Sequence, residues 1–133
     1  EKVYIYVFAD WYESGTYAIK ASPLSTPPTP LAASAWSAGS IGAEGYAFYY
    51  FNATAGQQYY IQWDDSYFGS GSYSLFTKVS AYHADGCTTF FTDCYYGYSN
   101  PRLITATKDG NIIIKVRPYS LGNTGTFAVR YYQ

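Results

Sequence analysis

Residue types that catalyse reactions or bind metals are scarce in this chain. His83 is the single histidine, and Cys87 and Cys94 are the two cysteines. These three side chains would make an unusual, incomplete zinc site. A nucleophile activated by histidine also needs an acid beside that histidine, and the acid within two positions of His83 is Asp85, in an expected turn. We therefore expect His83 to be a solvated histidine at a strand end, and the sequence predicts no enzyme and no catalytic residue.

Asp64 and Asp65 form the one adjacent acidic pair. Neighbouring residues of a strand point to opposite faces, so the two carboxylates cannot flank one glycosidic bond as a glycosidase requires. They are interpreted as ordinary turn acids. The alternative is that they supply part of a calcium site together with backbone carbonyls. Calcium is the one cofactor that the sequence leaves open.

The two cysteines lie seven positions apart in a segment that begins with the turn dipeptide Asp85-Gly86. A bridge between Cys87 and Cys94 would close a short loop and contribute about 2–3 kcal/mol on the chain-entropy model. The abundance of Tyr, Ser, Thr and Gly over Lys and Glu favours an oxidising compartment. We predict this disulfide, with two separately buried thiols as the alternative.

Composition excludes several classes of partner. The chain has 133 residues, enough for about one domain, with 13% charged residues and a formal net charge of −1. It lacks the basic stripe of a nucleic-acid binder and the basic cluster that anionic lipids attract. No apolar run approaches the roughly 20 residues of a membrane span. No signal peptide is recognised, so we expect a targeting segment to have been removed or to lie outside this sequence.

The elements that must position these residues are strands. The sequence repeats with period two, as in residues 3–8, where aliphatic and aromatic side chains alternate. No segment carries a helical stripe of useful length, so we predict an all-β antiparallel sandwich. Asp109-Gly110 is expected to join two strands as a hairpin. The runs rich in β-branched and aromatic residues, each bounded by Gly, Asn, Asp or Pro, are residues 3–8, 46–51, 57–63, 79–82, 103–107, 112–116 and 126–132.

An internal repeat divides the chain. Residues 15–20 (GTYAIK) recur as residues 125–130 (GTFAVR), and residues 3–7 match residues 112–116, as if one hairpin were used twice. Residues 22–30 hold four of the six prolines and are predicted to be a semi-rigid linker. We therefore predict three parts: the C-terminal hairpin of a preceding repeat (1–21), the linker (22–30) and a complete module (31–133). Such a chain would come from a tandem-repeat protein.

The hairpin of residues 1–21 has no module of its own. An isolated hairpin is marginal in water, so it must dock on the module, exchange strands with a neighbouring chain or stay disordered. Self-association through residues 1–21 therefore remains open.

Tyrosine is the residue in excess, with 18 in the chain. Two segments, residues 63–73 and 94–100, place aromatic residues between Gly and Ser, as binding loops do. The alternative is structural, because aromatic residues also fill sandwich cores and cross-strand pairs, and Trp63 is expected to be half-buried on that ground. The candidate ligand-binding residues are Tyr67, Tyr73, Tyr95, Tyr96, Tyr98 and, in the loop of the first hairpin, Trp11.

Three segments of the chain resemble, in their order and residue content, those of a bacterial pre-peptidase C-terminal (PPC) domain. They are residues 45–62 (GYAFYYFNATAGQQYYIQ), residues 79–86 and the ending at residues 112–129. The resemblance spans about residues 35–133. It implies a jelly-roll-like, non-catalytic sandwich attached to secreted bacterial hydrolases or surface proteins, related in fold to collagen-binding domains and some carbohydrate-binding modules. Glu44 is the one acid near the start of the module, which speaks against the calcium site of the collagen-binding relatives.

The sequence thus predicts a non-catalytic binding module of a secreted or cell-surface bacterial protein. The expected partner is an extracellular polymer, with polysaccharide favoured over collagen. The alternative is a structural spacer that builds an extracellular assembly by strand exchange through residues 1–21.

Overall fold

A computed structural model describes residues 16, 27–42, 45–66, 73–95, 100–120 and 122–133. The predicted first hairpin, Thr16 apart, lies outside the described residues, and so do the candidate ligand residues Trp11, Tyr67, Tyr96 and Tyr98. None of the described segments is a helix long and apolar enough to cross a membrane.

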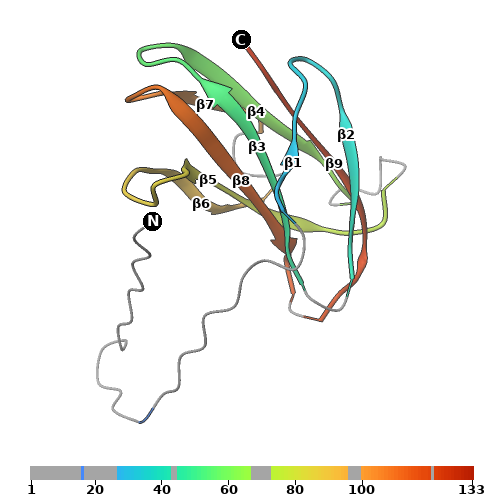
Figure 1. Cartoon of the computed structure of the whole chain (residues 1–133). Coiled ribbons are helices and arrows are strands. Elements are labelled where there is room, and N and C mark those ends of the chain that lie inside the picture. The colour runs from blue at the N-terminus through green and yellow to red at the C-terminus, as the bar shows by residue number, and fades with distance from the viewer. Residues whose placement is uncertain (1–15, 17–26, 43–44, 67–72, 96–99, 121) are drawn as a thin grey trace.

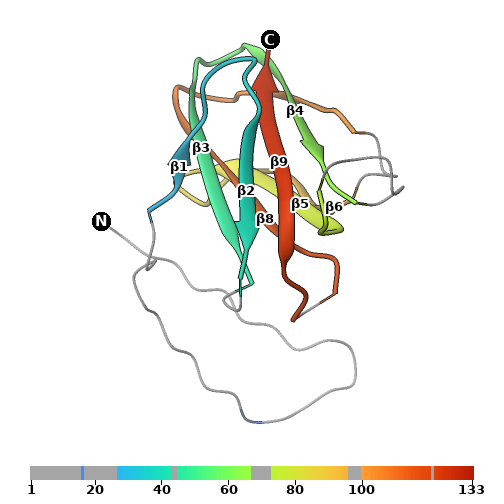
Figure 2. The same ribbon diagram turned by 90° about the vertical axis from the view of Figure 1, so that its right-hand side faces the viewer.

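Two sheets pack face to face (Figures 1 and 2). One sheet has five strands in the order β1-β3-β8-β5-β6, and the other has four in the order β2-β9-β4-β7. All pairings are antiparallel except that of β1 with β3. The predicted all-β sandwich is therefore confirmed. The strands are β1 (Thr29–Pro30), β2 (Ser37–Ile41), β3 (Ala47–Ala53), β4 (Gln58–Asp64), β5 (Thr77–His83), β6 (Thr89–Cys94), β7 (Arg102–Thr105), β8 (Gly110–Pro118) and β9 (Gly125–Tyr132).

The connections differ from those expected. Asp85-Gly86 turns β5 into β6 within one sheet, as a hairpin does. Asp109-Gly110 instead joins β7 of one sheet to β8 of the other, and β8 and β9 also lie in different sheets. The two predicted hairpins at these places are wrong. A turn dipeptide reports a chain reversal, but not whether the chain returns beside the same strand or arches over to the facing sheet.

Alternation along the strands builds the core between the sheets. In β4 the side chains of Tyr59, Ile61 and Trp63 are buried. Trp63 was expected to be half-buried but is fully buried, because it lies on the same inward face of β4 as Ile61. Across the core, the ring of Phe51 stacks on that of Tyr131 with centroids 4.0 Å apart. Each sheet therefore turns one row of residues inward and leaves the other row on its outer face.

The sandwich begins within the predicted linker. Thr29 and Pro30 of β1 lie beside Tyr49 and Tyr50 of β3, and the amide of Leu31 donates to the Tyr50 carbonyl at 2.8 Å. This short pairing is parallel and lies at the edge of the five-stranded sheet, where a proline is tolerated.

Candidate functional site

The two cysteines do not form the predicted disulfide. Cys87 lies in the turn between β5 and β6, whereas Cys94 is the last residue of β6, opposite Val79. Seven residues of extended chain separate their Cα atoms by roughly 20 Å, against the 4.4–6.8 Å of a disulfide. Both are free thiols. The prediction failed because the intervening residues form a strand, not a loop that folds back.

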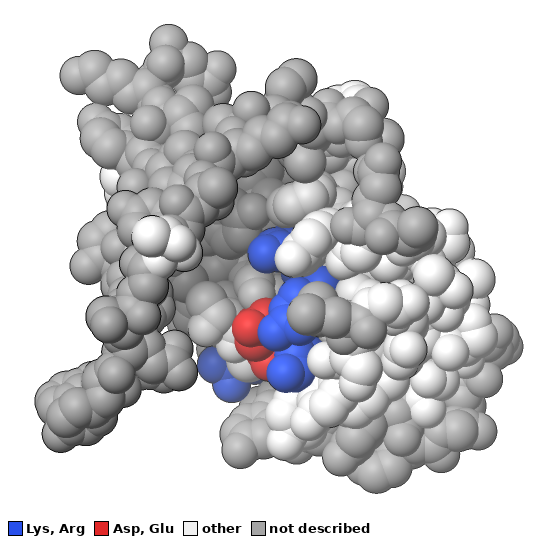
Figure 3. Space-filling view, turned by 90° about the horizontal axis from the view of Figure 1, so that it is seen from below, with Lys and Arg blue, Asp and Glu red and all other residues white. Residues whose placement is uncertain are grey.

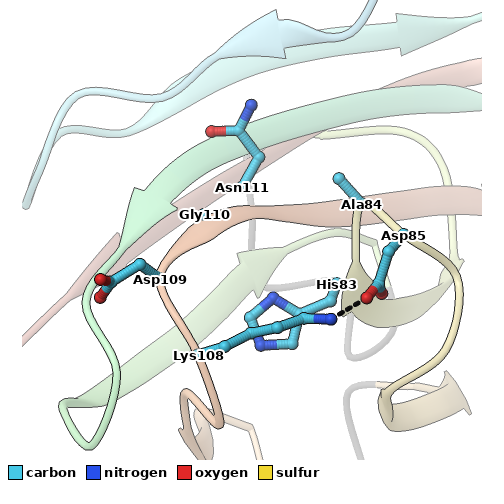
Figure 4. Close-up of a pocket in the computed structure, with 7 residues that line it drawn as sticks. All are labelled: His83, Ala84, Asp85, Lys108, Asp109, Gly110 and Asn111. Atoms are coloured by element: carbon cyan, nitrogen blue, oxygen red, sulfur yellow. Dashed lines mark hydrogen bonds and ion pairs between the residues drawn. The ribbon is translucent and has the colours of Figure 1, made fainter. Parts of the chain in front are cut away.

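His83 lies at the end of β5 and is 1% exposed, so the expectation of a solvated histidine is wrong. It lines a pocket of about 280 Å³ between the β5–β6 and β7–β8 turns, shown in Figure 4. The Lys108 side chain reaches past the imidazole ring to an ion pair with Asp85. The ring itself packs against Phe90, with centroids 5.1 Å apart.

The imidazole of His83 is enclosed by its neighbours. Its Nε2 atom is enclosed and makes no hydrogen bond among the described residues. A general base must come within hydrogen-bonding reach of the proton that it removes, and this atom is shut off from solvent. We therefore assign His83 a packing role beneath the Lys108–Asp85 pair.

Asp64 and Asp65 point to opposite sides, as the sequence predicted for neighbours at a strand end. Asp65 is buried, and its carboxylate accepts hydrogen bonds from the amide and the hydroxyl of Thr77 at 3.0 and 2.7 Å. Asp64 is half-buried on the outer side of β4. Among the described residues, no group of three or more His, Cys, Asp or Glu side chains is placed to hold a metal ion.

Two of the candidate tyrosines fall within the described residues. Tyr73 is half-buried just before β5. Tyr95 follows β6, and its ring meets the rings of Phe76 and Tyr119 edge-on at 5.9 and 5.6 Å. The structure therefore places Tyr95 in an aromatic cluster beside the five-stranded sheet. The other candidates lie outside the described residues, and the binding role of these loops remains a prediction.

The outer face of the four-stranded sheet carries a feature that the sequence reasoning missed. Four side chains from β9, β4 and the residue before β2 form a continuous stack, which we call the aromatic row: Trp36, Arg130, Tyr132 and Tyr60. The Arg130 guanidinium lies 4.4 Å from the Trp36 ring centroid and 5.1 Å from that of Tyr132. Tyr132 in turn stacks on Tyr60 with centroids 5.2 Å apart and planes within 18°.

Strand register holds the aromatic row in place. Tyr60 pairs with Tyr132, and Gln62 pairs with Arg130, across β4 and β9. Gln62 fixes the guanidinium, because its Oε1 accepts hydrogen bonds from Nε and Nη2 of Arg130 at 2.8 and 2.6 Å. Trp36 is 43% exposed and Tyr60 37%, so the row remains open to solvent. The result is a surface of rings with hydrogen-bonding groups fixed between them.

Solved structures show a related fold. The chain is similar to the pre-peptidase C-terminal domain of collagenase from Bacillus anthracis, with 18% identity over 80% of this chain and 98% of that one, at a TM-score of 0.57. The fold is PPC-like. The periplasmic g-type lysozyme inhibitor PliG from Aeromonas hydrophila matches 78% of this chain and 95% of its own at 15% identity and a TM-score of 0.42, which adds nothing to that assignment. No protein-family model and no curated protein matches the sequence.

The signal for the aromatic row was present in the alternation. Tyr60 and Gln62 occupy the positions between the buried Tyr59, Ile61 and Trp63, so they had to face outward. The sequence reasoning looked for binding residues in Gly- and Ser-rich loops and treated strand tyrosines as architecture. What it lacked was the strand order, which brings residues 36, 60 and 132 onto one face.

Proposed function

We propose that the chain is a non-catalytic extracellular module that attaches a secreted or surface protein to a polymer, and that the aromatic row is its binding surface. The observation that carries the proposal is the continuous stack of Trp36, Arg130, Tyr132 and Tyr60 on a sheet face open to solvent. The PPC-like fold supports the proposal, since the similar domain forms part of a collagenase.

The chemistry of the row favours a polysaccharide over collagen. Sugars present apolar C–H faces beside hydroxyl groups, and tyrosine and tryptophan combine an apolar ring with a polar tip. The Gln62–Arg130 pair adds fixed hydrogen-bonding groups in the middle of the row. The row crosses β2, β9 and β4, with Leu103 of β7 exposed beside Tyr60. At about 4.8 Å per strand, this gives an extended contact for a linear polymer.

Depletion binding to insoluble polymers tests the proposal. Purified protein is mixed with cellulose, chitin and collagen fibres, and the unbound fraction is measured. We expect binding to a polysaccharide, and its loss in the triple variant Trp36→Ala, Tyr60→Ala, Tyr132→Ala. The control is Tyr50→Ala, which removes a half-buried aromatic ring from β3 in the opposite sheet, outside the aromatic row.

The outcomes separate the alternatives. Circular dichroism must show that each variant keeps its strands, so that lost binding reports the surface and not the fold. Binding to collagen and to no polysaccharide would overturn the polymer class. Equal binding by the triple variant and the wild type would remove the aromatic row from the function. If the chain instead associates by strand exchange through residues 1–21, deletion of that segment should lower the number of chains per particle measured by light scattering.

A further inference from the structure

The outer face of the five-stranded sheet carries a second surface of different chemistry. Lys78 of β5 lies opposite Arg117 of β8, and Lys115 of β8 lies opposite Ser80. Three of the eight Lys and Arg residues thus gather on one face of a chain whose net charge is −1. Figure 3 shows Lys and Arg atoms gathered beside Asp and Glu atoms on the side of the molecule that it draws. We call the five residues Lys78, Lys115, Arg117, Tyr46 and Tyr119 the cationic face.

Each lysine of the cationic face is held by a tyrosine ring. The Lys115 ammonium lies 4.5 Å from the Tyr46 ring centroid, and the Lys78 ammonium lies 4.4 Å from that of Tyr119. Both tyrosines are more than 40% exposed. Neither lysine forms an ion pair within the part of the chain that the structure describes. Two positive charges are therefore presented beside exposed aromatic rings, and among the described residues neither forms an ion pair with a carboxylate.

A carboxylate already occupies one edge of this face. Asp93 of β6 accepts hydrogen bonds from Nε and Nη2 of Arg117 at 2.9 and 2.8 Å, the two-pronged geometry that arginine prefers. The backbone conformation directs the Asp93 carboxylate toward Arg117. Asp93 has a φ of +50°, in the left-handed region, and lies at the point where β6 shifts register against β5. Such a bulge re-aims a side chain. The Ser80 hydroxyl, accepting from the Asp93 amide at 2.9 Å, fixes this conformation.

The pKa of Asp93 shows that the cations share one field. The hydrogen bond from Arg117 lowers the pKa of this carboxyl below its ordinary value, and the charges of Lys78 and Lys115 lower it further. All three cations therefore act on a carboxylate at this place. The field of the face stabilises anions, and Asp93 pairs with Arg117, whereas neither lysine is ion-paired within the described part of the chain.

We propose that the cationic face binds a polysaccharide that carries carboxylate or sulfate groups, with its anionic groups at Lys78 and Lys115 and its sugar rings against Tyr46 and Tyr119. The site is separate from the aromatic row, so the two proposals stand or fall independently. Together they would let one module contact a neutral and an acidic polymer on opposite faces.

The rings favour a sugar over an acidic peptide. Glutamate and aspartate side chains would pair with the lysines but bring no flat apolar face to the two exposed tyrosines. A uronic acid or a sulfated sugar carries its charge on a ring whose C–H face can lie on tyrosine. Charge complementarity attracts either partner, and the aromatic contacts distinguish them.

Calorimetric titration tests the proposal with four probes: heparin, polygalacturonate, neutral dextran and polyglutamate. We expect wild-type protein to bind the two acidic polysaccharides and not dextran, with an affinity that falls as salt rises. The variant Lys78→Gln, Lys115→Gln should bind about five- to tenfold more weakly, as expected for two partly exposed ion pairs. Lys108→Gln is the control for the loss of one positive charge, because Lys108 lies in the β7–β8 turn and pairs with Asp85.

Asp93→Asn provides the opposite change. It releases Arg117 from its carboxylate and should tighten binding to heparin and polygalacturonate about two- to fivefold, since one charge is removed from the rim of the site. The triple variant of the aromatic row should bind both as the wild type does. Unchanged affinity in the double lysine variant would overturn the proposal. Polyglutamate binding as tight as that of polygalacturonate would also overturn it, in favour of an acidic peptide.

Discussion

The two outer faces of the sandwich each centre on an arginine of an inner strand, but the two arginines are anchored in different ways. Arg130 donates to the neutral amide oxygen of Gln62 and lies between the rings of Trp36 and Tyr132. Arg117 donates to the carboxylate of Asp93 and has lysines as its neighbours. In the first case arginine serves as a flat spacer in a stack, and in the second it serves as a charge.

The different anchoring of Arg130 and Arg117 indicates that one sandwich can carry two surfaces with different dependence on salt. Stacking on aromatic rings depends on shape and desolvation, and is little affected by salt. Attraction between exposed charges is screened within about 10 Å at moderate ionic strength. Changes that strike the core should damage both faces, and changes to one face should leave the other intact.

The largest effect is expected from a change beneath both faces. Gly39 of β2 faces Phe127 of β9, and a Cβ atom at this position would overlap the Tyr49 hydroxyl and lie 2.8 Å from the Phe127 ring. Gly39→Ala should therefore lower the free energy of unfolding by about 1–3 kcal/mol, as overpacking of a core does. Chemical denaturation measures this loss.

Gly42→Ala is the matched control for that change, since a Cβ atom there meets nothing within 4 Å. Because Gly39→Ala acts through the core, binding to neutral and acidic polymers should weaken together. A selective loss on one face would contradict this account of the position.

Conservative changes of the two arginines should separate the faces. Arg130→Lys keeps the charge but loses the planar group between Trp36 and Tyr132, so binding to the neutral polymer should weaken about tenfold. Arg117→Lys also keeps the charge, and binding to heparin should stay within about twofold, because that face acts through charge. Equal sensitivity of both faces to the two substitutions would show that the comparison is wrong.

Much of the fold could be predicted from the sequence. Alternation in segments such as residues 57–63 and 112–116 predicts strands with one buried face, and β4 and β8 have that pattern. The connections could not be predicted, because Asp85-Gly86 and Asp109-Gly110 are the same dipeptide, yet one stays within a sheet and the other crosses between sheets. Strand order is set by packing over the whole sandwich and not by the turn residues.

The candidate sites depended on that missing information. Trp36, Tyr60 and Tyr132 are far apart in sequence, and only the order β2-β9-β4 makes them neighbours. The same holds for Lys78 and Arg117, which the pairing of β5 with β8 brings together. Cys87 and Cys94 show the converse, since nearness in sequence suggested a bridge that an extended strand prevents. The phase of each residue within its strand could be predicted, but not which residues would share a face.

The smallest expected effect is a difference in pH dependence between the two anchors. Arg117 lowers the pKa of Asp93 in the folded protein, so the unfolded chain binds this proton more readily. The stabilisation from the Asp93–Arg117 pair is therefore fully present above the unfolded pKa of about 3.9 and is lost as pH falls through the lower, folded value. We expect the melting temperatures of wild type and Asp93→Asn to converge as the solution is acidified below that range. Arg117→Gln should show the same convergence, whereas Gln62→Ala should cost the same stability at every pH, because the amide that anchors Arg130 does not titrate.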